Sequence, residues 1–162
     1  MKNIAIILSG GVGSRMNLDV PKQYILVNGK PVFLYCLKTF FENDFVDALV
    51  VVVAKEWKEF VKTHVALVNC SKPLFYAEPG ETRQYSILNA LNVVKGLFDG
   101  DEKIVIIHDA ARPLVSSDLI NQCLEGCRDA DAVMPVIPVK DTMYFSEDGK
   151  NFIIKNTKFD KT

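Results

Sequence analysis

Two basic side chains lie in a glycine-rich stretch near the start of the chain. Residues 4–8 are apolar and uncharged, and three glycines follow within the next five positions. Such a run is typical of a strand buried on both faces, and the glycines let the backbone turn sharply and present bare N–H groups. Arg15 and Lys22 add two cations to the same connection. The stretch therefore predicts a phosphate-binding loop that is suited to a polyphosphate.

Glycine spacing alone is a weak signal, because it also occurs in ordinary strand-to-helix turns. A Walker loop is excluded, since no Gly-Lys-Ser/Thr run follows four spacer residues. A dinucleotide-binding turn is disfavoured by Pro21, which interrupts a helix soon after the glycines. In dinucleotide-binding folds an acidic residue that binds the ribose follows the second strand, but here Lys55 stands at the end of the second predicted strand. We expect a triphosphate in this loop rather than NAD.

Three further polar clusters each follow an apolar run of the kind that forms a strand. They are residues 80–83 (Gly-Glu-Thr-Arg), 108–113 (His-Asp-Ala-Ala-Arg-Pro) and 138–142 (Pro-Val-Lys-Asp-Thr). In a parallel sheet the carboxyl ends of the strands meet at one edge, and ligands bind outside that edge. We therefore expect these clusters and the glycine-rich loop to converge on one site.

The alternation of strands and helices predicts one three-layer, Rossmann-like α/β domain over residues 1–162, with a mostly parallel sheet. Thr82 is the expected N-cap of the third helix. Residues 144–162 contain a turn between two extended pieces and predict a β-hairpin arm after a core of about residues 1–143. Buried strands are expected at residues 4–8, 47–54 and 104–107, and further strands at 74–77 and 132–136. Helices are expected at residues 32–41, 56–67, after Thr82, and at 117–129. A turn is expected at residues 28–31.

The composition is that of a soluble globular domain, with 49% hydrophobic and 24% charged residues and a net charge of -1. This balance gives no broad attraction to nucleic acid or to acidic membranes, so small-molecule partners are expected. Cys123 and Cys127 have no nearby histidine to complete a zinc site, and the four cysteines are expected to be buried free thiols. No signal-peptide core or membrane span is present in the sequence, so we expect a cytoplasmic protein.

Together with residues 21–23 (Pro-Lys-Gln) and Ser86, the four clusters resemble the CTP-dependent polyol-phosphate cytidylyltransferases. That family contains 2-C-methyl-D-erythritol 4-phosphate cytidylyltransferase and ribitol-5-phosphate cytidylyltransferase, and the resemblance runs in order over nearly the whole chain. It implies a nucleotidyltransferase reaction in which an acceptor phosphate attacks the α-phosphorus of CTP in line and releases pyrophosphate. Catalysis of this kind rests on positioning and on cationic stabilisation, without a covalent intermediate.

The resemblance also implies roles for individual residues. Arg15 and Lys22 would be the catalytic residues that stabilise the charge on the transferring group. Asp109 would hold the nucleotide together with Mg²⁺. Arg112 and Thr142 would bind the polyol phosphate, with Thr142 contributed across a homodimer that forms through the hairpin arm. The residues expected to contact CTP are Ser9, Gly10, Gly11, Gly13, Gly80, Glu81, Arg83, Ser86 and Ala110.

Plainer structural interpretations stand beside several of these roles. Asp109 is also suited to cap a helix or to pair with Arg112, and Arg83 is suited to anchor its loop through a salt bridge. His108 is expected to be structural, because the nucleophile is already an anionic phosphate that needs no base. His64 is expected to be an ordinary helix residue.

The chain departs from the family pattern at its C-terminal end. Family members continue beyond the arm and supply a basic residue and a late lysine that position the polyol phosphate. Lys158 or Lys161 stands near the first of these positions, and the late lysine has no counterpart. We therefore expect a C-terminally truncated member with the nucleotide half of the site, an incomplete acceptor half, and reduced or no activity.

The acceptor and two rival functions stay open. Residues 9–11 (Ser-Gly-Gly) lean towards the ribitol branch, whereas residues 108–113 lean towards the methylerythritol branch. A sugar-phosphate nucleotidyltransferase that uses UTP or GTP would share the glycine-rich loop, but would not be expected to carry residues 80–83 and 108–113 together. A non-catalytic nucleotide-binding module is the third possibility.

Overall fold

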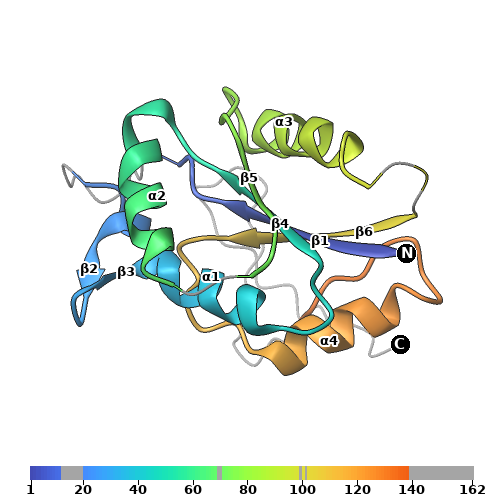
Figure 1. Ribbon diagram of the computed structural model, residues 1–162. Helices are drawn as coiled ribbons and strands as arrows, with labels where there is room; N and C mark the ends of the chain where they lie inside the picture. The colour runs from blue at the N-terminus through green and yellow to red at the C-terminus, as the bar shows by residue number, and fades with distance from the viewer. Residues whose placement is uncertain (12–19, 69–70, 99, 101, 139–162) are drawn as a thin grey trace, which may run out of the picture.

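A four-stranded parallel sheet forms the centre of the molecule. The computed structural model of the protein describes residues 1–11, 20–68, 71–98, 100 and 102–138. The order across the sheet is β5-β4-β1-β6, and every neighbouring pair is parallel (Figure 1). The strands are β1 (Lys2–Leu8), β4 (Ala48–Val52), β5 (Leu74–Ala77) and β6 (Lys103–Asp109). The sheet confirms the predicted α/β class.

Alternate residues of the central strands face opposite layers of the molecule. On β1, Ala5 and Ile7 belong to one apolar cluster, while Ile4 and Ile6 belong to the other, and all four side chains are fully buried. β4 is buried along its whole length. Strands covered on both faces must be apolar on both, which is why uncharged runs predicted these two strands correctly.

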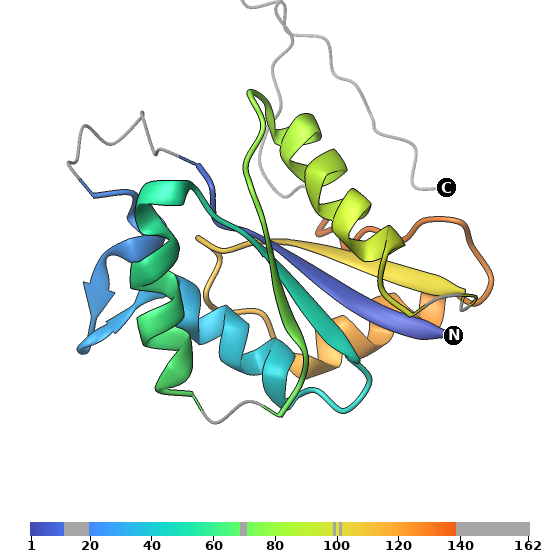
Figure 2. The ribbon, with the colours of Figure 1, turned by 45° about the horizontal axis from the view of Figure 1, so that its top comes forward.

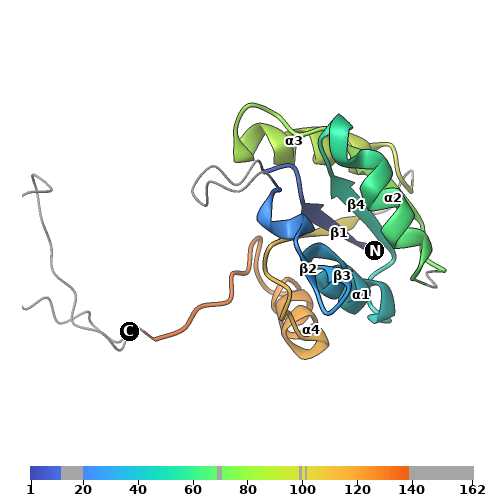
Figure 3. The same ribbon diagram turned by 90° about the vertical axis from the view of Figure 1, so that its left-hand side faces the viewer.

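Helices cover both faces of the sheet and complete the three predicted layers. They are α1 (Val32–Glu42), α2 (Lys58–Ala66), α3 (Arg83–Lys95) and α4 (Ser117–Gly126), and a 3₁₀ helix, η2 (Lys55–Trp57), precedes α2. The α1, α2 and α4 helices pack into the cluster that contains Ala5, whereas α3 packs into the cluster that contains Ile4. Figures 2 and 3 show α3 on one side of the sheet and α1 and α4 on the other.

Between β1 and α1 the chain forms a 3₁₀ helix and a small hairpin. The 3₁₀ helix, η1 (Lys22–Tyr24), leads into β2 (Leu26–Val27), which pairs antiparallel with β3 (Lys30–Pro31). The two residues at the turn, Asn28 and Gly29, have φ values of 50° and 74°. Two-residue hairpin turns of type I′ require positive φ at both positions, and Asn-Gly supplies them with little strain. The predicted turn is therefore present.

Two predictions at the far edge of the sheet are wrong. Residues 132–136 do not form a strand, and Met134 is 78% exposed. Pro135 has no N–H to donate to a neighbouring strand, which disfavours pairing of this segment with β6. β6 is thus the edge strand among the described residues, and Ile107 is 42% exposed although residues 104–107 were expected to be buried.

The cysteine prediction is confirmed only in part. Cys36 is a buried free thiol, whereas Cys123 and Cys127 are free but only half-buried. Cys123 lies on α4 and Cys127 directly follows this helix, and both line a hollow beside the edge strand β6. Cys70 lies outside the described residues, as does the hairpin arm predicted at residues 144–162.

No helix in the described ranges is both long enough and apolar enough to cross a membrane.

Candidate functional site

The topology creates a switch point between β1 and β6. From β1 the chain passes outward through β4 to β5, and β6 then lies on the opposite side of β1. Leu8 and Asp109, the last residues of these strands, are register partners. Ligands of open parallel sheets bind outside the carboxyl ends of the strands at such a point. The glycine-rich loop and residues 108–113 therefore begin side by side, as predicted.

The start of the glycine-rich loop is held against the neighbouring strands. The N–H of Ser9 donates to the carbonyl of Val52 at 2.9 Å. A Cβ atom on Gly10 would lie 2.6 Å from the Cβ of Pro79, whereas Gly11 has open space around its Cα. Close packing therefore requires glycine at position 10, while position 11 is exposed.

Two side chains of η1 bind the carbonyl groups of this loop. Gln23 Nε2 donates to the carbonyls of Ser9 at 2.8 Å and Gly11 at 2.7 Å. The Tyr24 hydroxyl donates to the Ser9 carbonyl at 2.7 Å. Both side chains are buried. The sequence analysis assigned no role to Gln23 or Tyr24. The only feature of the sequence that could have pointed to them is their position directly after Lys22.

Lys22 lies on the same turn as these two residues. Lys22 is exposed, whereas the next two residues, Gln23 and Tyr24, are buried. The turn is thus anchored to the start of the glycine-rich loop, and Lys22 itself is exposed. Its predicted partner Arg15 lies outside the described residues.

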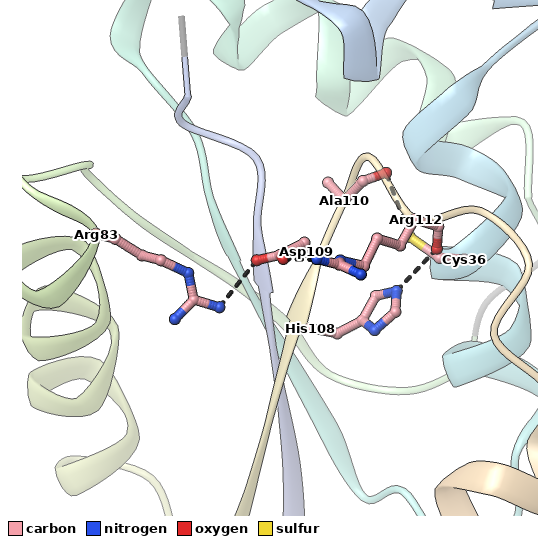
Figure 4. A network of polar contacts seen from close by, with 6 residues as sticks. All are labelled: Cys36, Arg83, His108, Asp109, Ala110 and Arg112. Atoms are coloured by element: carbon pink, nitrogen blue, oxygen red, sulfur yellow. Dashed lines mark hydrogen bonds and ion pairs between the residues drawn. The ribbon is translucent and has the colours of Figure 1, made fainter. Parts of the chain in front are cut away.

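Asp109 forms ion pairs with two arginines from different elements. Arg83 Nη2, at the start of α3, lies 2.9 Å from Asp109 Oδ1, and Arg112 Nε lies 3.0 Å from Asp109 Oδ2. Figure 4 shows the two guanidinium groups approaching the carboxylate from opposite sides. The plainer interpretations of Asp109 and Arg83, as salt-bridge partners, therefore describe this structure.

The two arginines keep the Asp109 carboxyl ionised. Burial alone would raise the pKa of Asp109, but the hydrogen bonds and charges of Arg83 and Arg112 outweigh burial and hold this pKa below its ordinary value. Two guanidinium groups and one carboxylate leave one net positive charge in the cluster. This charge lies beside the glycine-rich loop, where it favours an anionic ligand.

The turn after β6 is contacted by a histidine and a cysteine (Figure 4). His108 Nε2 lies 2.9 Å from the carbonyl of Arg112. The Cys36 thiol lies 3.8 Å from the carbonyl of Ala110 and 3.1 Å from that of Phe33, the nearer acceptor for its single proton. Burial lowers the pKa of His108 and raises the pKa of Cys36 to about 12, so both groups are neutral near pH 7. The expected structural role of His108 fits this contact. Ala110 is fully buried, and its N–H donates to the carbonyl of Leu8 at 3.0 Å.

The 80–83 cluster is shaped by the start of α3. The N–H of Gly80 donates to Ser86 Oγ at 3.0 Å, and the same oxygen donates to the carbonyl of Thr82 at 3.0 Å. Thr82 Oγ1 accepts from the N–H of Tyr85 at 3.3 Å, which confirms the predicted N-cap. A Cβ atom on Gly80 would lie 2.3 Å from the Cβ of Tyr85. Glu81 is exposed at the tip of this loop.

The predicted site residues divide into three groups. The loop start, Gly80 and the Asp109 cluster lie at the carboxyl edge of the sheet, where Ser86 shapes the Gly80 loop and Ala110 lies buried beneath the turn. Lys22 lies on the turn that contacts the loop start. Gly13, Arg15 and Thr142 lie outside the described residues.

Asp109 is the carboxylate that lies at the end of β6 beside the loop start, whereas Glu78 and Glu81 belong to the loop that follows β5. The described residues contain no group of three or more histidine, cysteine or carboxylate side chains that could hold a metal ion. Mg²⁺ keeps several waters and is commonly bound by one or two carboxylates together with substrate phosphates. Among the described residues this edge therefore fits an ion carried by a polyphosphate better than an ion enclosed by protein ligands.

An apolar hollow of about 140 Å³ lies apart from these residues, between β6 and α4. None of the predicted site residues lines it, and its walls include Ile107, Leu119, Cys123 and Val133. The hollow marks the open edge of the sheet and has none of the charge that a phosphate ligand requires.

A comparison with protein families matches residues 3–160 to the model described as IspD, 2-C-methyl-D-erythritol 4-phosphate cytidylyltransferase. The chain is 40% identical over 141 residues to a 2-C-methyl-D-erythritol 4-phosphate cytidylyltransferase of Lachnospira eligens, covering 87% of this chain and 60% of that protein. It is 36% identical over 141 residues to a ribitol-5-phosphate cytidylyltransferase of Vibrio parahaemolyticus, covering 86% of this chain and 59% of that protein.

The solved structures that match this fold are similar to the same group of proteins. The fold matches 4-diphosphocytidyl-2C-methyl-D-erythritol synthase from Anaerococcus prevotii with a TM-score of 0.75 and 26% identity, covering 93% of this chain and 61% of that one. It also matches the bifunctional IspDF from Campylobacter jejuni with a TM-score of 0.72 and 28% identity, covering 90% of this chain and 36% of that one. The chain thus spans between 36% and 61% of the length of these relatives.

Proposed function

Because the chain belongs to the 2-C-methyl-D-erythritol 4-phosphate cytidylyltransferase family, we propose that it transfers CMP from CTP to a polyol phosphate. The products are a CDP-alcohol and pyrophosphate. The observation that carries the proposal is the position of the glycine-rich loop directly beside the Asp109 cluster, with Leu8 and Asp109 in register. This arrangement gives backbone donors and excess positive charge at the carboxyl edge of the sheet, which is what a triphosphate requires.

In the proposed reaction an oxygen of the acceptor phosphate forms a bond to the α-phosphorus of CTP. The bond from that phosphorus to the bridging oxygen of pyrophosphate breaks, and pyrophosphate leaves with the electron pair. The nucleophile is already an anion, so no side chain has to remove a proton. The residues instead align the two phosphates and neutralise charge that develops between them.

Lys22 and Arg15 are the proposed catalytic residues. Lys22 supplies a cation from an anchored turn beside the start of the loop, and Arg15 follows the glycines in the sequence. Removal of one preorganised contact of this kind costs about 3 kcal/mol of barrier, on the order of a hundredfold in rate.

Asp109 is the proposed protein ligand for Mg²⁺ that arrives with the triphosphate. The ion would supply neutralisation of phosphate charge. Arg83 and Arg112 each contact one of the two carboxylate oxygens, so the ion would bind at the remaining lone pairs or displace one of the arginines. A guanidinium group released in this way is available to a phosphate, and for Arg112 the proposed ligand is the acceptor phosphate, which Thr142 would share.

The nucleoside is proposed to lie against the Gly80 loop. Gly80, Glu81 and Ser86 provide backbone and polar groups at the start of α3, next to Arg83. The acceptor is 2-C-methyl-D-erythritol 4-phosphate or D-ribitol 5-phosphate. The two relatives named above, with 40% and 36% identity, belong one to each branch.

We further propose a homodimer formed through residues 144–162, and a cytoplasmic location. Both proposals rest on the resemblance to the family. Sedimentation of the chain at micromolar concentration tests the first proposal, for which a dimer is the expected result and a monomer would count against it.

The test of the function is pyrophosphate release from CTP with each polyol phosphate. We expect slow release that depends on one acceptor and falls about a hundredfold further in Lys22→Ala. Faster release with UTP or GTP would favour a sugar-phosphate nucleotidyltransferase. CTP binding without pyrophosphate release from either acceptor would favour a non-catalytic nucleotide-binding module.

A further inference from the structure

The Gln23 side chain joins two carbonyl groups of the glycine-rich loop. Its Nε2 lies 2.8 Å from the carbonyl oxygen of Ser9 and 2.7 Å from that of Gly11, and only 3% of the residue is exposed. Both partners can only accept, so the nitrogen of the amide must face them. The side chain thus uses both of its N–H donors on the loop backbone.

Tyr24 binds the same loop from a rigid position. Its hydroxyl donates to the Ser9 carbonyl at 2.7 Å and accepts from Ser9 Oγ at 3.0 Å. The ring stacks on Trp57 with centroids 4.6 Å apart and meets the edges of Phe33 and Phe60. Burial raises the pKa of Tyr24, so the hydroxyl keeps the proton that it donates. The Ser9 carbonyl therefore accepts two hydrogen bonds from a fixed scaffold.

Holding the Ser9 carbonyl also orients the next N–H. The C=O and N–H of a planar trans peptide point in opposite directions, and the carbonyl of Ser9 shares its peptide unit with the N–H of Gly10. This N–H is therefore directed away from Gln23 and Tyr24. Among the described residues none accepts a hydrogen bond from it. Gln23 and Tyr24, which form a brace for the Ser9 carbonyl, thus present the Gly10 N–H at the carboxyl edge of the sheet as a donor that the described residues leave unused.

We propose that Gln23 and Tyr24 are positioning residues that orient the Gly10 N–H towards the phosphates of the nucleotide. They also tie the turn that carries Lys22 to the loop, so that the cation and the backbone donor move as one unit. The inference rests on the proposed function, since it assigns these residues to the same triphosphate.

The test compares CTP binding by matched variants of the chain in the presence of Mg²⁺. Gln23→Met keeps the length of the side chain but removes both donors, and Tyr24→Phe removes only the hydroxyl. Tyr35→Phe is the matched control, because the Tyr35 hydroxyl also donates to a backbone carbonyl, that of Val27, in the β2–β3 hairpin. Asn43→Leu removes another buried amide, which lies before β4 at the opposite edge of the sheet.

We expect Gln23→Met and Tyr24→Phe to raise the Kd for CTP about tenfold, which corresponds to about 1.4 kcal/mol. Tyr35→Phe and Asn43→Leu should leave the Kd within about twofold of the value for the unaltered chain. This should hold even if their melting temperatures fall as much as those of Gln23→Met and Tyr24→Phe. Weakened binding that simply follows the loss of melting temperature across all four variants would overturn the positioning role, and so would unchanged binding in Gln23→Met.

A second readout does not depend on the nucleotide. The carbonyl ¹³C shift of Ser9 and the amide ¹⁵N shift of Gly10 report on this peptide unit, and both should move in Gln23→Met and Tyr24→Phe but not in Tyr35→Phe. Unmoved shifts would contradict the brace itself. If the shifts move but the unaltered chain binds no CTP, the proposed function fails, and the phosphate role of the brace is overturned with it.

Discussion

At the scale of single residues, Asp109 has the clearest conflict between two roles. In the structure both of its carboxylate oxygens are paired with arginines, whereas the proposed reaction requires the carboxylate for Mg²⁺. The arginine side chains are 57% and 76% exposed, so the pairs are weak and open at little cost. An ion pair that stabilises little is suited to exchange partners when a ligand arrives.

Asp109→Asn should separate the two roles. Because both pairs are exposed to solvent, we expect the free energy of unfolding to change by less than about 1 kcal/mol. Binding of CTP with Mg²⁺ should weaken about tenfold or more, because an amide is a poor ligand for Mg²⁺. Thermal unfolding and titration with CTP, each with and without Mg²⁺, measure the two effects. A loss of stability without a change in Mg²⁺-dependent binding would mean that Asp109 acts only as a salt-bridge partner of the two arginines.

His108 predicts a pH dependence of stability. Its pKa in the folded protein is lowered below 6.5, mainly by burial, against the nearby charge of Asp109. Below pH 6.5 the unfolded chain therefore binds a proton that the folded chain does not, and the free energy of unfolding falls as the pH is lowered. His108→Gln removes this contribution, so its stability should decline less between pH 7 and pH 5 in denaturant titrations. Parallel pH profiles of the two proteins would contradict the assignment.

At the scale of elements, the loop start requires glycine at one position and not at its neighbour. Gly10→Ala would place a Cβ 2.6 Å from Pro79, whereas Gly11→Ala meets no heavy atom within 4 Å. We expect Gly10→Ala to destabilise the fold by about 1–3 kcal/mol through overpacking, and Gly11→Ala to leave stability nearly unchanged. Urea unfolding of the two variants measures the difference. Equal effects would show that the loop does not pack on Pro79 as described.

The sequence was informative about elements where a physical requirement acts locally. Uncharged runs predicted β1 and β4, because a strand covered on both faces must be apolar, and Thr82 predicted the start of α3, because its side chain can bind a free N–H there. Residues 132–136 satisfy the same apolar pattern but do not pair. Hydropathy does not register the missing N–H of Pro135, and it cannot tell an edge strand such as β6 from a central one.

At the scale of the whole molecule, the parallel topology accounts for the location of the site. Polar clusters that follow separate strands meet at one edge whatever their distance along the chain, and this allowed the convergence of residues 9–11, 80–83 and 108–113 to be predicted. The Asp109–Arg112 pair was among the interpretations that the sequence offered, whereas contacts between segments far apart in the sequence were not predictable. Gln23 reaches Ser9 and Arg83 reaches Asp109 only after the chain has folded back, and no periodic pattern records such pairs.

The central claim is that the glycine-rich loop and Lys22 hold the triphosphate of CTP. Calorimetric titration of this chain with CTP and Mg²⁺ tests it most directly, with Lys22→Ala as the variant and Lys30→Ala, an exposed lysine of the hairpin, as the matched control. We expect the unaltered chain and Lys30→Ala to bind CTP alike, and Lys22→Ala to bind at least about tenfold more weakly, since hydrogen bonds to charged groups contribute about 1.5–3 kcal/mol. Absence of CTP binding by the unaltered chain, or equal binding by all three proteins, would contradict the account.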